Sequence, residues 1–170
     1  MSDIVALPHQ TESEIATLGA DGEVALHHDG SPPEVMRERI DDLVQRMLST
    51  PLAEQRSLRV EHVIEDGMYM RKLFIPKDTV LAGKIHLKSC LNIVASGDIT
   101  VLTEFGLRRC QAGFTGVSQS GSQKVGHAHA DTIFINVFRT DNKDLESIEA
   151  EIAGIEHAHA VETEMELLCL

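Results

Sequence analysis

The feature that most constrains this chain is a change in the spacing of its apolar residues at Leu58. From there the sequence alternates between apolar and polar residues, first over 58–65 and then, after the turn dipeptide Asp66-Gly67, over 68–75. A period of two puts every second side chain on one face of a strand, whereas a helix needs a period of about 3.6. Short runs of this kind, separated by glycine and proline turns, continue to residue 140. The region 58–140 is therefore predicted to form an antiparallel sandwich or small barrel.

The stretch VLAGKIHLKSCLNIVASGDITV at 80–101 is the most informative part of this region. It predicts a strand ending near Leu81, a bend at Gly83, a strand through His86, an apolar run over 91–95, and a turn at Ser96-Gly97-Asp98 before a new strand. Glycine in a tight turn between apolar runs is a hairpin signal. We therefore expect Gly97 to mark the tip of a hairpin.

The run at 131–139 carries apolar residues on both of its faces. Its members are Ile133, Ile135 and Val137 on one face and Phe134 and Phe138 on the other. Only one face can line the barrel, so the other is expected to meet a partner subunit. The acidic end of the chain also carries apolar residues that we expect to dock on a subunit, namely Met165, Leu167, Leu168 and Leu170. Together these features predict a homo-oligomer, most simply a two-fold dimer.

Two helices are predicted outside the barrel. The sequence Ser31-Pro32-Pro33-Glu34 is typical of a helix start, and apolar residues then recur at helical spacing as far as Leu48. On its exposed side we expect the ion pairs Arg37/Asp41 and Asp42/Arg46. A shorter helix is predicted over 145–153, ended by Gly154.

The chain thus divides into three parts. Residues 1–57 form an acidic N-terminal arm and amphipathic helix, 58–140 the barrel, and 141–170 an acidic C-terminal helix and tail. Within the first part, residues 1–30 show no sustained period and are expected to be extended or loosely packed.

The net charge of −12 comes from the two ends of the chain. Residues 1–50 carry −7, residues 51–140 carry +3 and residues 141–170 carry −8. An acidic chain with 4% aromatic residues and no tryptophan lacks the basic groove and stacking platforms of a nucleic-acid binder. The first ten residues have no basic region or long apolar run, and no segment could span a bilayer, so we expect a soluble, unexported protein. Three cysteines without a CxxC spacing favour a reducing compartment.

The order of residues in two stretches resembles the cupin superfamily. The first stretch is 80–101, and the second is SGSQKVGHAHADTIFINVF at 120–138. The resemblance implies a mainly β fold, a cupin-like double-stranded β-helix or jelly-roll barrel, with the N-terminal and C-terminal helices outside it. In such barrels two histidines and a glutamate of the first motif and one histidine of the second hold iron, manganese, zinc or nickel.

Carried over by counting back from Gly97, the first motif matches that ligand set only in part. His86 falls on the second histidine, Lys84 on the first and Cys90 on the glutamate, while His127 falls on the histidine of the second motif. Two hypotheses stay open. His86, His127 and Cys90 could form a reduced site for zinc, or for iron or manganese; or the histidines are hydrogen-bonded lining residues and no cofactor is expected.

The charged residues near these histidines favour the second hypothesis. If 84–88 is a regular strand, Lys84 and Lys88 share a face with His86, and an inward histidine brings lysines with it. Such an interior, lined also by His129 and Asp131, suits an anionic or polar ligand better than a metal.

A further resemblance concerns the combination G-x-I-H…L-N-I with a later D-T-hydrophobic strand, which is similar to small cupins encoded by tailed bacteriophages. It implies a non-catalytic binding or assembly protein that acts as a homo-oligomer, in the virion or the host cytoplasm, with other phage proteins as partners. The alternative is a metal-dependent enzyme, such as an isomerase, lyase or dioxygenase. No nucleophile elbow or phosphate loop is present, and no catalytic residue is predicted.

Overall fold

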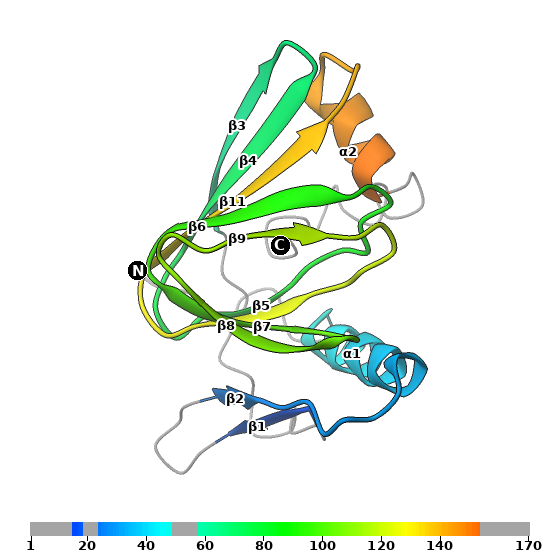
Figure 1. Ribbon diagram of the computed structural model, residues 1–170, viewed down its shortest axis with the longest axis vertical. Coiled ribbons are helices and arrows are strands. Elements are labelled where there is room, and N and C mark those ends of the chain that lie inside the picture. Colours follow the sequence, from blue (N-terminus) through cyan, green and yellow to red (C-terminus); the bar gives the residue numbers. More distant parts are fainter. Residues whose placement is uncertain (1–14, 19–23, 49–57, 154–170) are drawn as a thin grey trace.

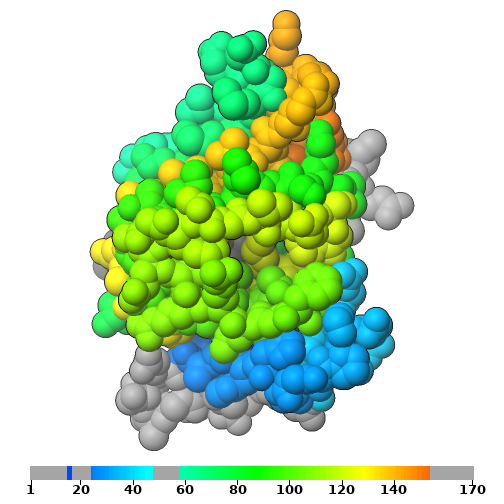
Figure 2. Space-filling model, in the orientation of Figure 1, coloured from blue at the N-terminus to red at the C-terminus, as the bar shows by residue number. Residues whose placement is uncertain are grey.

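The computed structural model describes residues 15–18, 24–48 and 58–153. Two antiparallel sheets face each other, with a short hairpin and one helix on one side and a second helix at the opposite end (Figure 1). In the space-filling view the N-terminal elements, in blue, lie below the green and yellow sandwich (Figure 2). No helix in the described part of the chain is long and apolar enough to cross a membrane.

The larger sheet has five strands in the order β3-β4-β11-β6-β9. Their bounds are Arg59–Glu65 (β3), Met68–Ile75 (β4), Thr132–Arg139 (β11), Cys90–Ser96 (β6) and Thr115–Ser118 (β9). The smaller sheet has four strands in the order β5-β10-β7-β8. Their bounds are Val80–Ala82 (β5), Val125–Ala128 (β10), Asp98–Thr103 (β7) and Gly106–Gln111 (β8).

The strands pair in a nested order that defines the fold. β4 pairs with β11, β5 with β10, β6 with β9 and β7 with β8, all antiparallel. A long hairpin whose two arms pair in this way and wind into two facing sheets is a jelly roll, also called a double-stranded β-helix. The predicted mainly β fold, a double-stranded β-helix or jelly-roll barrel, is confirmed by this pairing, with β3 added as an extra strand beside β4.

The core of the barrel lies between the two sheets. Every second residue of each strand points into it, as the sequence alternation predicted. The buried side chains of this core are Leu58, Leu73, Ile75, Leu81, Val94, Ile99, Cys110, Ala128 and Phe134.

A second core covers the outer face of the four-stranded sheet. The hairpin of β1 (Ala16–Leu18) and β2 (Val24–Leu26) and the helix α1 (Pro33–Leu48) pack there. The helix contributes Met36, Ile40, Leu43, Val44 and Met47, and the sheet contributes Val80, Ala82, Leu102 and Val125. The predicted helix is confirmed. The expectation of a loosely packed arm is wrong for the described residues before α1, because the hairpin buries Ile15, Ala16, Val24 and Leu26.

Ion pairs tie α1 to its surroundings in a way that was predicted in part. Asp42 and Arg46 pair at 2.7 Å as expected. Arg37, however, binds Glu104 at 2.5 Å rather than Asp41. Glu104 is only 2% exposed, and a buried carboxylate is strongly destabilising unless a cation pairs with it. The Asp41 carboxylate on α1 has less need of such a partner because it is exposed.

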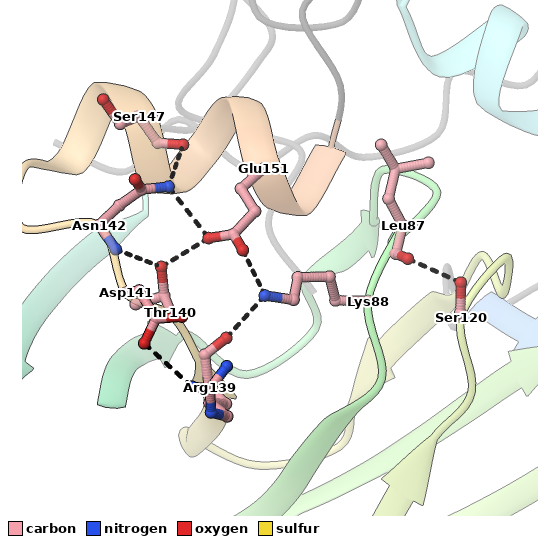
Figure 3. Close-up of polar contacts among 9 residues, drawn as sticks. All are labelled: Leu87, Lys88, Ser120, Arg139, Thr140, Asp141, Asn142, Ser147 and Glu151. Carbon is pink, nitrogen blue, oxygen red and sulfur yellow. Dashed lines mark hydrogen bonds and ion pairs between the residues drawn. The ribbon is translucent and has the colours of Figure 1, made fainter. Parts of the chain in front are cut away.

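The helix α2 (Leu145–Ala153) closes one end of the sandwich on the inner side of the five-stranded sheet. Ile148 and Ile152 pack against Tyr69, Cys90 and Phe138. Figure 3 shows the polar contacts that hold it: Glu151 accepts hydrogen bonds from Lys88, Thr140 and Asn142. The backbone N–H of Leu87 also donates to Ile152 O at 2.6 Å. This predicted helix is confirmed, whereas its expected end at Gly154 and the docking of the last leucines lie outside the described residues.

Gly97 stands at the predicted turn, between β6 and β7, with φ +91°. A Cβ added there would lie 2.4 Å from the carbonyl oxygen of Asp131 and 2.4 Å from Thr132 Oγ1. The β6–β7 turn therefore approaches the β10–β11 turn as closely as backbone allows, and only glycine fits.

Replacing Gly97 by alanine is expected to lower the free energy of unfolding by about 3 kcal/mol or more. About 1–2 kcal/mol of this comes from the left-handed backbone, and the rest comes from the clash with 131–132. Gly113→Ala is the matched control, because Gly113 has φ +89° but open space around its Cβ position. Urea unfolding of both variants measures the difference, and equal losses would contradict the close approach.

Candidate functional site

A row of polar residues crosses the inner face of the five-stranded sheet. His62 on β3 is opposite Arg71 on β4, which is opposite Asn136 on β11, which is opposite Asn92 on β6. Leu73, Phe134 and Val94 lie on one side of this row. Tyr69, Phe138 and Cys90 lie on the other. Arg71, Asn136 and Asn92 therefore form a buried polar layer between two apolar layers, and His62, which is exposed, lies at its edge.

Asn92 is the centre of the hydrogen bonds in this layer. Its Oδ1 accepts from Asn136 Nδ2 at 2.8 Å, from Lys124 Nζ at 3.1 Å and from the Cys90 thiol at 3.6 Å. Its Nδ2 donates to Ser118 Oγ at 2.8 Å. Asn136 Oδ1 in turn accepts from Arg71 Nη2 at 3.3 Å. We call Arg71, Asn92, Ser118, Lys124 and Asn136 the interior cluster.

The interior cluster buries two cations. Arg71 is 3% exposed and Lys124 is 4% exposed. The Glu149 carboxylate of α2 reaches within 3.9 Å of Arg71 and also accepts a hydrogen bond from Tyr69. Among the described residues, Lys124 has no carboxylate within ion-pair distance, and the buried Nε of Arg71 has no hydrogen-bond partner. The cluster thus holds more positive than negative charge.

Burial changes the protonation of this site. It lowers the pKa of Lys124 from 10.5 to about 8, and the nearby charge of Arg71 acts in the same direction, while Cys90 opposes it. Burial also raises the pKa of the Cys90 thiol above its usual value. At neutral pH the site therefore presents a charged amine beside a neutral thiol, the reverse of a reactive thiolate.

His86 and Lys84 lie in the segment 83–89, which is not the predicted strand. It runs instead along the loop before β10: Gly83 N–H donates to Lys124 O at 2.7 Å and His86 N–H to Ser122 O at 3.2 Å. Both side chains are buried, but Lys88 turns away to Glu151 of α2, so the expected common face of all three is wrong. His86 Nδ1 lies 3.8 Å from Cys90 Sγ, and its ring packs edge-on against Phe138.

His127 does not join His86 and Cys90. In the register of β10 it is opposite Thr100 and Val80, on the face where Val125 packs against the N-terminal layer, whereas Ala128 faces the barrel core. Its ring instead contacts His129, with centroids 4.6 Å apart. The spacing of the motif assigned the right strand, but side chains alternate along it and this histidine falls on the outer face.

The predicted lining residues His129 and Asp131 also lie away from the interior cluster. His129 Nε2 is 2.7 Å from Thr100 Oγ1, on the same side of the sheet as His127. Asp131 is exposed and accepts a hydrogen bond from Lys77 N–H, so it supports the turn beside Gly97. Of the three lining residues, Lys84 alone is buried among the elements that hold His86.

The donor set does not fit the metal ion that the sequence resemblance implied. Within the described residues, no three His, Cys, Asp or Glu side chains are arranged to hold a metal. Near Cys90 lies the Lys124 amine, whose positive charge repels a cation.

The sequence contained a signal for the interior cluster that motif spacing did not use. On β11, Asn136 shares the buried face of the strand with Phe134 and Phe138. On β6, Asn92 shares the buried face with Cys90 and Val94. A polar residue at an inward position needs partners. No sequence pattern indicated Lys124, because it lies just before β10 and so belongs to no alternating strand. Its partner Asn92 is also 32 residues away in the sequence.

Comparison with protein-family models gave no match, and neither did comparison with curated protein sequences. Solved structures of similar arrangement include KdgF from Halomonas sp., with 16% identity, 52% of this chain and 84% of that chain covered, and a TM-score of 0.46. An RmlC-like cupin from Shewanella frigidimarina has 15% identity, coverage of 52% and 80%, and a TM-score of 0.43. Ectoine synthase from P. lautus has 13% identity, coverage of 56% and 73%, and a TM-score of 0.45. The fold assignment itself depends on the strand order given above.

The buried charge of Lys124 predicts how stability changes with pH. Because its pKa in the folded protein is about 8 and its usual value is 10.5, the unfolded chain binds more protons between these values. The free energy of unfolding should therefore rise from about pH 8 to pH 10.5, by roughly 3 kcal/mol in total from this group. The charged and titrating groups that face it are Arg71 and Cys90.

Lys124→Met should remove this rise and be most stabilising, relative to the natural protein, below pH 8. Lys88→Met is the control, because Lys88 is partly exposed and pairs with Glu151 at the surface. Urea unfolding between pH 7 and 10.5 measures the free energy of unfolding of both variants. The rise with pH should be present in Lys88→Met and absent in Lys124→Met. A slope that persists in Lys124→Met would contradict the assignment.

Proposed function

We propose that this protein is a non-catalytic jelly-roll binding or assembly protein that acts as a homo-oligomer and binds an anionic group in its interior. The observation that carries the binding part is the interior cluster, where Arg71 and Lys124 are buried together around the Asn92 amide. Two buried cations with one nearby carboxylate form an environment that favours a second negative charge.

The contact made by α2 supports a carboxylate or phosphate as the ligand chemistry. Glu149 already brings a carboxylate to Arg71 and Tyr69, so this end of the cluster accepts such a group. Arg71 Nε remains without a partner, and guanidinium groups bind carboxylate and phosphate oxygens through paired N–H donors. Lys124, Ser118 and Asn136 would supply further donors.

The same residues argue against catalysis by the interior. A nucleophilic cysteine needs a depressed pKa and a close base, but the pKa of Cys90 is raised and its contact with His86 is 3.8 Å long. The metal-dependent alternative lacks a cluster of three donors among the described residues. Binding is therefore the function that this chemistry supports best.

The setting that we propose is a tailed phage particle or the host cytoplasm during infection, with other phage proteins as partners. Its support is the G-x-I-H…L-N-I sequence resemblance given above. The two-sided strand β11 supports the homo-oligomer, because its outward residues Ile133, Ile135 and Val137 are apolar and only partly buried in a single chain.

A thermal-shift screen with citrate, acetate, inorganic phosphate and sulfate tests the binding site. We expect one class of anion to raise the melting temperature of the natural protein at pH 7 and to have no such effect on Lys124→Met. Lys88→Met should keep the response, because Lys88 lies at the α2 contact and not in the cluster.

Elemental analysis of the purified protein separates binding from the enzyme alternative. Zinc, iron and manganese are expected well below one equivalent per chain. Stoichiometric metal that is lost in His86→Ala would overturn the proposal, as would an anion response that survives unchanged in Lys124→Met.

A further inference from the structure

The outer face of the five-stranded sheet carries an apolar row that runs from one edge to the other. Val63, Met70, Val137, Leu91 and Val117 stand opposite one another in register on β3, β4, β11, β6 and β9. We call this row the outer stripe. Three members are well exposed in the single chain: Val63 at 48%, Leu91 at 53% and Val117 at 60%.

The rest of this face is also poor in unpaired charge. Ile135 and Ile93 stand beside the stripe in the next row, and Met68, 55% exposed, flanks it on the other side. The outward charges of β3 and β4 sum to zero: Arg59 and Lys72 against Glu61 and Glu65. Glu61 pairs with both Arg59 and Lys72, and these two cations also lie over the Phe74 ring.

The chain covers its two sheets unequally. The outer face of the four-stranded sheet is buried under the β1–β2 hairpin and α1. The helix α2 packs on the inner side of the five-stranded sheet, against Tyr69 and Phe138. Within the described residues, therefore, the apolar outer face of the larger sheet is left uncovered although its counterpart is not.

We infer that the outer stripe is the surface on which two copies of this chain associate, face to face. The inference rests on the proposed homo-oligomer and assigns its interface. A copy of the same chain fits because the outward charges of β3 and β4 cancel and the outward Arg139 of β11 pairs with Asp141, so two such faces meet without net repulsion. The two ends of the chain, at −7 and −8, would instead repel their copies. A partner chosen by charge would need an unpaired charge on this face.

The geometry suits a two-fold pair. A two-fold axis that runs along the outer stripe, in the plane of the interface, places the stripe of one copy on the stripe of the other. Apolar side chains then meet apolar side chains, as between two sheets packed about 10 Å apart. Five strands about 4.8 Å apart and about 3.3 Å per residue give the face an extent of about 20 by 25 Å. The accessible area of this face is larger than its flat extent because side chains project from it. It approaches the roughly 800 Å² that each partner buries in a standard interface.

Light scattering of the full chain at micromolar concentration tests the inference. The natural protein is expected to have the mass of a dimer, and Leu91→Glu that of a monomer, with the dissociation constant raised about 100-fold or more. Leu107→Glu is the matched control and should remain a dimer, because Leu107 is a similarly exposed leucine, 43%, on β8 of the other sheet. Val117→Glu, on the edge strand, should dissociate the dimer independently, and circular dichroism checks that each variant is folded.

The outcomes separate this inference from the proposed function. A natural protein that is monomeric overturns both. A dimer that survives Leu91→Glu and Val117→Glu overturns the interface and leaves the homo-oligomer standing. A dimer dissociated by Leu107→Glu as readily as by Leu91→Glu also overturns the interface, because it places the contact on the other sheet.

Discussion

The register of β4, β11 and β6 is the constraint on which both the interior and the surface of this protein depend. Adjacent residues on these strands have opposite roles: Asn136 joins the interior cluster and Val137 joins the outer stripe. A slip of one residue would exchange the two faces, putting valine, leucine and methionine inside and arginine and asparagine outside. Such a slip is resisted because the flanking inward residues, Phe134 and Phe138, are large and fully packed.

The five-stranded sheet therefore reverses the usual arrangement over one row. Ordinarily the inner face of a barrel strand is apolar and the outer face polar. Here the middle of the inner face is polar and the outer stripe beside it is apolar. Buried charged groups rarely add stability over a packed apolar core, because desolvation costs about as much as their interactions return. The interior cluster is thus better explained by binding or by specificity of the fold than by stability, and its desolvation cost is visible at Lys124, whose pKa burial lowers to about 8.

The sequence predicted the elements of the barrel better than it predicted the site. Alternation, the turn at Gly97 and both helices depend on local residue order, so one chain was enough to find them. The hairpin of β1 and β2 was missed because strands of three residues are too short to show a period. Motif spacing did not show that His127 lies on the outer face of β10, because it counts residues but cannot tell which face of the strand each one occupies. Lys124 and Asn92 were not predicted to interact, because they are 32 residues apart and only the folded barrel brings them together.

Lys124 places a positive charge near Cys90, one of the positions where the sequence resemblance put a metal ligand. By the sequence resemblance, His86 and Cys90 fall on two ligand positions, and the structure does bring them within 3.8 Å of each other. The group near Cys90 is the Lys124 amine, which carries a positive charge itself and donates a hydrogen bond to Asn92 Oδ1. A fixed ammonium cannot polarise a substrate as a divalent ion does, but it still attracts an anion. The described interior therefore holds two buried cations and no group of three metal donors, an environment that suits an anion better than a metal ion.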